Sequence, residues 1–348
     1  MADMMKRVVL AARPDGAPTT DNFRLEDAPM PEPGPGEFLV RVLWLSLDPY
    51  MRGRMDESKS YAKPVPIGGA MEGGTVGQVV ASNNDRFAPG DFVLTHSGWC
   101  SHAVSDGKGV RKLDPDLAPV QTALGVLGMP GMTAYVGLHE HGRPNSGETL
   151  VVGAASGAVG SVVGQLAKIA GLRVVGVAGG VQKCAYVVDA LGFDACIDHR
   201  AAPDVEALRA QLAEACPDGV DIYYENVGGK TLEAVIGLMN PFGRIPVCGT
   251  IAWYDLGGLG QGAVEGPNTL PRVWRAILVN RLAVRGFIVW DHADRFKEFL
   301  TEVSGHIRNG RLKYRETVAE GLENAPDAFL SLLKGGNFGK QLVKVADM

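Results

Sequence analysis

Residues 149–164 read TLVVGAASGAVGSVVG, and this stretch decides the fold. A strand-like apolar run, Leu150–Val152, enters a glycine-rich turn that opens directly into a helical pattern. The turn matches the dinucleotide-binding fingerprint, with Ala155 in place of its first glycine and with Gly157 and Gly160 following. In such a turn the helix N-terminus holds phosphates, one glycine admits the pyrophosphate and the next lets helix and strand pack closely. A glycine-rich turn of any α/β protein is the alternative, and the strand–turn–helix setting weighs against it.

Downstream of this turn, strand-like and helix-like segments alternate, which predicts a doubly wound parallel sheet in an α/β protein. The expected strands are Thr149–Gly153, Arg173–Ala178, Ala195–Asp198, Asp221–Glu225, Gly243–Gly249 and Arg281–Val289. The expected helices between them are Val159–Ala170, Lys183–Leu191, Asp204–Ala215 and Lys230–Met239.

Upstream of the turn, short strand-like runs between Gly/Pro turns predict a small barrel or sandwich. These runs are Glu37–Leu47, Thr75–Ser82, Asp91–Thr95 and Ser101–Val104. The end of the chain does not continue the alternation, and we expect it to complete the first domain. It reads as helix Asp294–Asn309, strand Tyr314–Val318, helix Asn324–Leu333 and strand Gln341–Val345. The predicted domains are residues 1–123, with 311–348 folding back onto them, and residues 124–310.

The composition excludes several classes of function. The 348 residues carry a net charge of −5, so a nucleic-acid partner is not expected. The most apolar region, Leu150–Val181, contains polar residues and many glycines, and we interpret it as a buried βαβ unit, not a membrane span. The 5 cysteines are scattered without any C-x-x-C, which argues against a disulfide framework and favours the reducing cytoplasm.

The choice of nicotinamide cofactor depends on the end of the second strand. An NAD enzyme places Asp or Glu there to accept from the ribose 2′-hydroxyl. Here Arg173–Ala178 is followed by GGVQK, and the first acid is Asp189. The ammonium of Lys183 would instead attract a 2′-phosphate, so NADPH is favoured over NADH. A solvated lysine in the first helical turn is the alternative.

Two catalytic motifs that the chain lacks limit the reactions expected of it. Dehydrogenases of this layout often bind a catalytic zinc through Cys and His. In GGAMEGG (68–74) Met71 stands where a histidine would be expected, and His139 and His141 are spaced for different helix faces. We therefore expect no metal. A Tyr-x-x-x-Lys motif is missing as well, which disfavours alcohol oxidation. A conjugated enone can accept hydride with only a hydrogen-bond donor and a proton source, and a tyrosine hydroxyl can supply the bond.

Several longer motifs make the chain resemble the zinc-independent medium-chain reductases of the prostaglandin reductase, leukotriene hydroxydehydrogenase, plant double-bond reductase and curcumin reductase group. The resemblance covers nearly the whole length. It is carried by LDPYMRGRM (47–55), AASGAVGSVVGQ (154–165), YYENVGG (223–229), EGLENAP (320–326) and GNFGK (336–340). It implies a GroES-like β-rich catalytic domain, a Rossmann domain, NADPH and a homodimer.

The resemblance also implies the site residues. Tyr254 matches a tyrosine near the substrate carbonyl, and Tyr50 matches a second pocket tyrosine. His199 stands where relatives often have a tyrosine beside the cofactor. The cofactor-binding positions are Ser156, Gly157, Ala158, Val159, Gly160, Lys183, His199, Asn226, Cys248, Gly249, Thr250, Phe287, Ile288, Val289 and Asn337. By themselves the residues allow plainer roles, namely a packed Tyr50, a loop aromatic at Tyr254 and turn formers at Asn226 and Asn337.

The predicted function is NADPH-dependent reduction of the C=C bond of an α,β-unsaturated ketone or aldehyde, with hydride reaching the β-carbon and Tyr254 stabilising the enolate. An NADPH quinone oxidoreductase of the same superfamily is the nearest alternative, and a secondary alcohol dehydrogenase is a weaker one. A non-catalytic NADPH-binding sensor is the alternative from another class. The Gly/Pro-rich segment Leu256–Pro271 is predicted to form a flap over the pocket.

Overall fold

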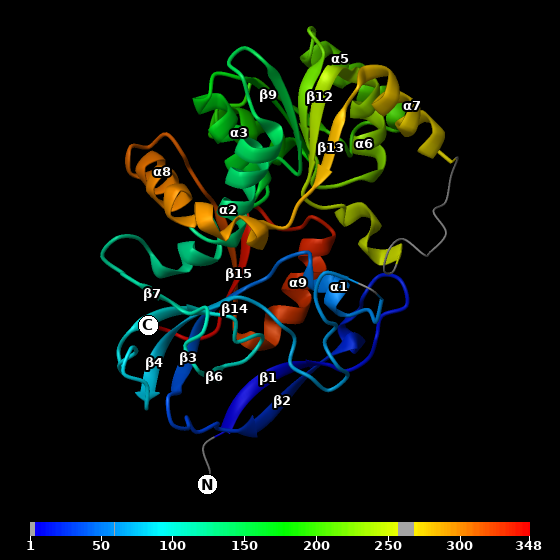
Figure 1. The fold of residues 1–348 in the computed structure, drawn as a ribbon. Helices are drawn as coiled ribbons and strands as arrows, with labels where there is room; N and C mark the ends of the chain where they lie inside the picture. The colour runs from blue at the N-terminus through cyan, green and yellow to red at the C-terminus, as the bar shows by residue number, and fades with distance from the viewer. Residues whose placement is uncertain (1–3, 59, 257–267) are drawn as a thin grey trace. The chain divides into compact units, whose positions relative to one another are not determined.

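The computed structural model describes residues 4–58, 60–256 and 268–348 (Figure 1). The chain divides into two compact units, each formed by segments that are distant in sequence. The first comprises the described residues of Met1–Gly125, Tyr254–Ala263 and Glu316–Met348, and the second those of Val126–Trp253 and Val264–Arg315. Most of the predicted flap, Leu256–Pro271, lies outside the described residues.

The first unit is built on a seven-stranded sheet in the order β14-β15-β3-β4-β5-β7, with β6 also pairing β3. A separate antiparallel pair, β1–β2, was not expected from the sequence. The strands are β1 (Met4–Leu10), β2 (Phe23–Pro29), β3 (Phe38–Ser46), β4 (Thr75–Ser82), β5 (Phe92–Thr95), β6 (His102–Ser105), β7 (Arg111–Leu113), β14 (Glu316–Glu320) and β15 (Lys340–Lys344).

The chain's tail completes this sheet, as expected. β15 pairs antiparallel with β3, and β14 pairs parallel with β15. The short helix α1 (Met51–Arg54) follows β3, and α9 (Ala325–Leu333) lies between the two tail strands. Phe329 of α9 contacts Trp99 edge-on, and Phe23 stacks on Trp99, which is fully buried. This aromatic group therefore ties the tail to the N-terminal strands through apolar burial.

The second unit is a six-stranded parallel sheet in the order β10-β9-β8-β11-β12-β13, which confirms the doubly wound topology. The strands are β8 (Thr149–Gly153), β9 (Arg173–Ala178), β10 (Ala195–Asp198), β11 (Val220–Tyr224), β12 (Met239–Val247) and β13 (Ala283–Gly286). Three of them, β8, β9 and β10, have the predicted bounds. β12 begins four residues before the predicted Gly243, and β13 is shorter than the predicted Arg281–Val289.

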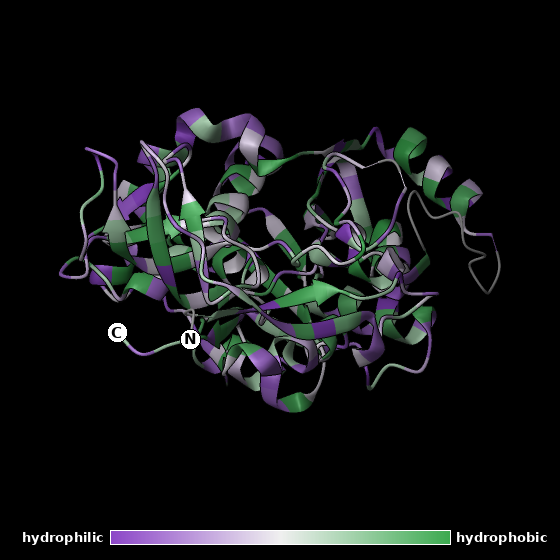
Figure 2. Cartoon of the chain, turned by 90° about the horizontal axis from the view of Figure 1, so that it is seen from below, coloured by the Kyte–Doolittle hydropathy of each residue, from purple (hydrophilic) through white to green (hydrophobic). Residues whose placement is uncertain are grey.

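Helices cover both faces of this sheet, so successive strand residues enter different cores. Val152 and Tyr224 pack with α2, α3 and α8, whereas Val151 and Tyr223 pack with α5, α6 and α7. The helices are α2 (Met129–Val136), α3 (Gly160–Ile169), α4 (Val181–Asp189), α5 (Val205–Ala215), α6 (Gly229–Val235), α7 (Leu270–Asn280) and α8 (Phe296–Arg308). A π-helical turn, Gly137–Gly142, follows α2. In Figure 2 the helices carry both hydrophobic and hydrophilic residues, as amphipathic surface helices do.

Strand order places a switch point between β8 and β11, the two central strands. The connections that leave their carboxyl ends run in opposite directions, and ligands of doubly wound sheets bind at such a point. No helix of the described residues is long and apolar enough to cross a membrane.

Candidate functional site

The turn after β8 is tied to the sheet and tightly folded. Ala155 N donates to Val177 O of β9 at 3.0 Å, and Gly157 N donates to Ala154 O at 2.9 Å. Ala154 has a positive φ of 51°, a conformation that glycine usually takes. A Cβ on Gly160 would stand 2.4 Å from Ala154 O, so only glycine lets α3 begin this close to the turn.

The beginning of α3 suits an anion. Ser156 is buried, while Gly157, Ala158 and Val159 are partly exposed. Within the described part of the chain, the N–H groups of Ala158 and Val159 donate to no backbone oxygen of the turn. Because unsatisfied N–H groups at a helix N-terminus attract phosphates, this turn fits the pyrophosphate of a dinucleotide.

Basic side chains gather at the adjacent carboxyl ends of β9 and β10. A Cβ on Gly179 would lie 2.8 Å from Arg200 Nε and 3.0 Å from His199 Nε2, so both side chains lie over this glycine. Lys183 stands on the first turn of α4. Burial and the nearby Arg200 guanidinium lower the pKa of Lys183. Burial lowers the pKa of His199, and Lys230 and Arg200 lower it further. The parts of these pKa shifts that come from Arg200 and Lys230 reflect like charges close together, which an anion would offset.

Two further residues fix this basic group. The Lys230 ammonium donates to His199 O and to Ala202 O, both at 2.7 Å. Asp198 Oδ1 accepts from Gly180 N at 2.8 Å and from Arg200 N at 2.9 Å. Burial would raise the pKa of Asp198, but these backbone hydrogen bonds hold it below its usual value. The carboxylate is therefore occupied by the backbone, and Ala178–Gly180 itself brings no acid to the end of β9.

The segment after β11 braces the switch point. Asn226 Nδ2 donates to Gly153 O at 2.9 Å, which links the ends of the two central strands. The buried carboxyl of Glu225 accepts through Oε1 from Val227 N at 2.6 Å, from Gly228 N at 2.8 Å and from the Tyr223 hydroxyl at 3.0 Å. Within the described residues its Oε2 has no partner, and burial raises the pKa of Glu225. Glu225 thus shapes the loop that carries Asn226.

The segments after β12 and β13 belong to the same unit. Cys248 N and Gly249 N both donate to Glu225 O, at 2.9 and 3.1 Å, which places them beside the β11 loop. Burial raises the pKa of the Cys248 thiol to about 12. Thr250 O accepts from Trp253 N at 2.9 Å, which begins the 3-10 turn Ile251–Leu256.

Phe287, Ile288 and Val289 follow β13. Phe287 contacts the rings of Tyr224 and His141, and Val289 is buried in the same core. Ile288 is partly exposed, and its carbonyl accepts from Asp291 N. The Phe287 side chain therefore packs against the second unit's own core.

Tyr50 lies in the first unit, in a turn held by a buried ion pair. Lys340 Nζ donates to Asp48 Oδ1 at 2.6 Å and to Leu47 O at 2.7 Å, and the Ser46 hydroxyl donates to the other Asp48 oxygen. Burial raises the pKa of Tyr50 far above its usual value, with the Asp48 and Glu72 carboxylates adding to the effect. The Tyr50 hydroxyl therefore keeps its proton and can donate a hydrogen bond.

Met71, which stands where a zinc-binding dehydrogenase would have a histidine, is a core residue of the first unit. Met71 is fully buried, and its backbone pairs with Val8 and Trp99. The Arg54 guanidinium lies 5.5 Å from the Tyr50 ring and 4.4 Å from the Tyr61 ring, and Arg54 Nε donates to Glu72 at 2.7 Å. No group of three or more His, Cys, Asp or Glu side chains that could hold a metal ion occurs among the described residues.

Tyr254 and Asn337 also belong to the first unit. Tyr254 is partly buried within the Ile251–Leu256 turn, and the next residue, Asp255, pairs with Arg52. Asn337 Nδ2 donates to Gly339 O at 2.7 Å, so its amide also shapes a turn. The structure thus brings Lys183 and His199 together in one unit, and it places Tyr50, Tyr254 and Asn337 in the other.

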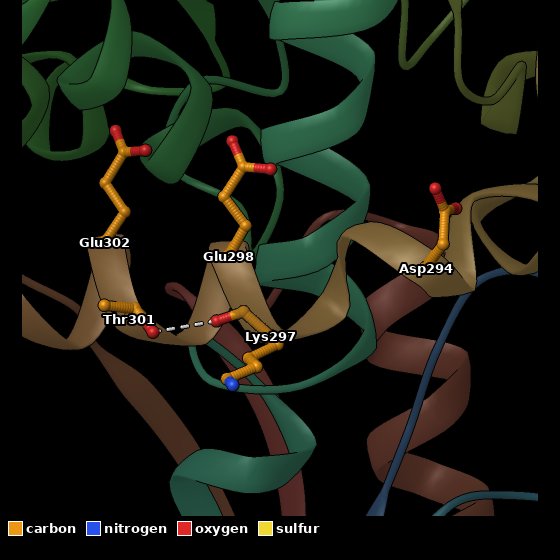
Figure 3. A pocket seen from close by; sticks show the side chains of 5 residues that line it. All are labelled: Asp294, Lys297, Glu298, Thr301 and Glu302. Carbon is orange, nitrogen blue, oxygen red and sulfur yellow. Dashed lines mark hydrogen bonds between the residues drawn. The ribbon is translucent and has the colours of Figure 1, made fainter.

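An open pocket on α8 has the wrong charge for a dinucleotide. It is lined by Asp294, Lys297, Glu298, Thr301 and Glu302 (Figure 3). The Tyr135 hydroxyl lies within hydrogen-bond distance of both glutamates, at 2.8 and 2.9 Å, and hydrogen bonds from Arg295 and Tyr135 lower the pKa of Glu298 to about 2. Three carboxylates would repel phosphate, so this pocket is not the cofactor site.

Sequence reasoning missed Arg200, Lys230, Glu225 and Arg52. Arg200 had a usable signal, because it follows the predicted strand Ala195–Asp198 and parallel strands end at one edge of a sheet. The sequence carries no signal for the contacts of Lys230 and Arg52, because their partners are distant in sequence.

Together the fold and these residues define a two-unit dinucleotide-binding protein with a basic group beside the phosphate turn. Comparison with known proteins agrees. Residues 6–113 match the family model described as the N-terminal domain of oxidoreductase, and residues 158–305 match the one described as zinc-binding dehydrogenase.

Relatives and solved structures match along nearly the whole chain. The NADPH-dependent curcumin reductase of Escherichia coli is 50% identical over 98% of this chain and 97% of its own. Prostaglandin reductase 1 of Rattus norvegicus is 43% identical over 95% of this chain and 96% of its own. The crystal structure of CurA in complex with NADPH from Vibrio vulnificus has a TM-score of 0.93 at 48% identity, covering 99% of this chain and 100% of that one.

The chain belongs to the zinc-independent medium-chain dehydrogenase/reductase family, in the group of the curcumin and prostaglandin reductases.

Proposed function

We propose that this protein is an NADPH-dependent oxidoreductase that reduces the C=C bond of α,β-unsaturated ketones and aldehydes. The observation that carries the cofactor assignment is a basic group at the strand end where an NAD enzyme would place an acid: His199 and Arg200 lie over Gly179, and Lys183 stands near them on the first turn of α4. The substrate class is supported by the relatives, which are named as curcumin and prostaglandin reductases.

In this proposal the second unit holds the cofactor. The turn Ser156–Gly160 would receive the pyrophosphate on the N–H groups of Ala158 and Val159, and the basic group would receive the 2′-phosphate. Asn226, Cys248, Gly249, Thr250, Phe287, Ile288 and Val289 would line the rest of the cofactor site. When bound, NADPH supplies a hydride for the β-carbon of the substrate.

The remaining chemistry is assigned to tyrosines of the first unit. The Tyr254 hydroxyl donates a hydrogen bond to the substrate carbonyl oxygen, and this bond strengthens as that oxygen becomes an enolate. Tyr50, whose hydroxyl stays protonated, lines the same pocket as a second donor. A proton from Tyr254 or from water then reaches the α-carbon. No Lewis acid is required, because conjugation already delocalises the developing charge onto oxygen.

We also propose a homodimer, formed through the open edge of the second unit's sheet. Among the described residues β13 is the last strand of the sheet, and its Val284 is 45% exposed. The neighbouring α7 exposes Trp274 and Leu278 by 67% and 77%. An unpaired edge strand beside exposed apolar side chains is suited to pairing with the same surface of a second copy. Sedimentation velocity of the wild type and of Trp274→Glu tests this, and a wild-type monomer would refute it.

A cytoplasmic location agrees with the 5 free cysteines.

The deciding experiment measures NADPH oxidation against enals, enones and quinones of graded size, with NADH in parallel. Enone reduction should give the highest kcat/KM, and product analysis should show a saturated ketone with its carbonyl intact. A preference for benzoquinones would instead favour the quinone oxidoreductase, and steady oxidation of a secondary alcohol with NADP would favour an alcohol dehydrogenase. Tight NADPH binding without consumption across the panel would favour a sensor.

A further inference from the structure

A buried arginine of the first unit joins two segments that each carry a proposed pocket tyrosine. Arg52 lies in α1, two residues after Tyr50, and is only 1% exposed. Its Nε lies 3.2 Å from Asp255 Oδ1, and Asp255 directly follows Tyr254. Arg52 and Asp255 are 203 positions apart in the chain, so this contact exists only in the folded unit.

The guanidinium is held in place independently of Asp255. Arg52 Nη1 donates to Asp56 Oδ1 at 2.7 Å, and Nη2 donates to Gly16 O at 2.8 Å. Because the arginine fork is planar and rigid, these two bonds already fix the direction in which Nε points. Arg52 therefore offers a prearranged donor, and the Asp255 carboxylate is the group that comes to it.

Asp255 is the more exposed partner of the pair. Its side chain is 50% exposed, and it lies near the end of the short 3-10 turn Ile251–Leu256. Short 3-10 turns have poor hydrogen-bond geometry and little stability of their own. A side-chain anchor one residue after Tyr254 therefore restricts the direction that the tyrosine takes.

We propose that Arg52 and Asp255 form a positioning pair for the reduction. Buried Arg52 binds Asp255 and thereby keeps the Tyr254 hydroxyl and the Tyr50 segment in a fixed position relative to each other, around one substrate carbonyl. This rests on the proposed role of Tyr254. Neither member of the pair needs to touch substrate. Rates respond steeply to such placement, since a displacement of about 1 Å can cost about 100-fold in turnover.

The test substitutes Asp255, the exposed member of the pair. Arg52 is left unchanged, because it is buried and its removal would leave Asp56 without its ion-pair partner. Asp255→Asn and Asp255→Ala should lower kcat for an enone about tenfold, with KM for NADPH changed less than twofold. Asp255→Glu keeps the charge and should recover most of kcat. The melting temperature should move by only a few degrees, about 5 °C at most, because Arg52 keeps its bonds to Asp56 and Gly16 when the half-exposed Asp255 is changed. Glu26→Gln is the matched control, since Glu26 pairs with Arg7 at 3.1 Å elsewhere in this unit, and it should leave kcat unchanged.

A double-mutant cycle with Tyr254→Phe separates positioning from a general structural effect. If Asp255 acts through Tyr254, Asp255→Ala should lower kcat less than twofold once the hydroxyl is gone. Multiplicative losses in the double variant would overturn the proposal, as would unchanged kcat in Asp255→Asn and Asp255→Ala. A loss in Tyr254→Phe without one in the Asp255 variants would refute the positioning pair and leave the proposed function standing. Full activity in Tyr254→Phe would refute both the positioning pair and the proposed role of Tyr254.

Discussion

Lys340 of the last strand donates a 2.6 Å hydrogen bond from Nζ to Asp48 Oδ1 inside the first unit, where the two side chains are 5% and 9% exposed. The pair joins β15 to the turn before Tyr50. Lys340→Met would leave the Asp48 carboxylate buried without its cation, and we expect a loss of about 3–5 kcal/mol in unfolding free energy. Urea unfolding measures it.

The control for this prediction lies on the same strand. Lys344 pairs with Asp347 at 2.7 Å, where Asp347 is 88% exposed. Lys344→Met should leave the urea midpoint unchanged, because an exposed pair is well solvated without its partner. Similar losses in the two variants would show that burial of the ion pair is not the cause.

Cofactor preference should depend on the basic group over Gly179. Lys183→Ala or Arg200→Ala should raise KM for NADPH about 10–100-fold, because each removes a charged hydrogen-bond donor worth about 1.5–3 kcal/mol. KM for NADH should change less than about twofold. Lys168→Ala is the control. Lys168 pairs with Asp194, which precedes the first residue of β10, whereas the basic group lies at the carboxyl ends of β9 and β10. Equal losses with both cofactors would rule out a 2′-phosphate contact.

Tyr254 should matter for turnover and not for cofactor binding. Tyr254→Phe removes one hydroxyl, and loss of a donor to a developing oxyanion typically lowers kcat about 100-fold or more. The Kd for NADPH, followed by fluorescence titration, should stay within about twofold of wild type. An unchanged kcat with an enone would remove Tyr254 from the mechanism.

Stability should depend on pH through Glu225. Burial raises the pKa of this carboxyl above its usual 4.5, so the native state keeps a proton that the unfolded chain releases. Its contribution to stability is complete below about pH 4.5 and is lost as pH rises through the native pKa. Each tenfold difference in proton affinity between the native and unfolded states corresponds to about 1.4 kcal/mol of unfolding free energy.

Glu225→Gln isolates this effect, because the amide keeps an oxygen for Val227 N and Gly228 N but cannot ionise. Urea unfolding at several pH values should show wild type losing stability relative to Glu225→Gln as pH rises from about 4.5. Parallel curves for the two proteins would mean that Glu225 titrates alike in the native and unfolded states.

Much of the fold could be predicted from local patterns. The strands Thr149–Gly153 and Arg173–Ala178 were predicted with their bounds, because strands buried on both faces are continuous apolar runs. The pair Met4–Leu10 and Phe23–Pro29 was missed, since charged residues interrupt both runs. Helix Leu270–Asn280 was missed as well, although its residues follow a clear amphipathic helical pattern.

The sequence by itself determined the phosphate turn, the parallel sheet and the absence of an acid after the second strand, because each depends on residues that are neighbours along the chain. Only the tertiary structure decided that Arg200 lies near Lys183, that Lys340 neutralises Asp48 and that Arg52 binds Asp255. Such pairs depend on strand order and packing, which bring together side chains up to 292 positions apart. The local sequence around a charged residue does not indicate which distant charged residue will lie beside it in the fold.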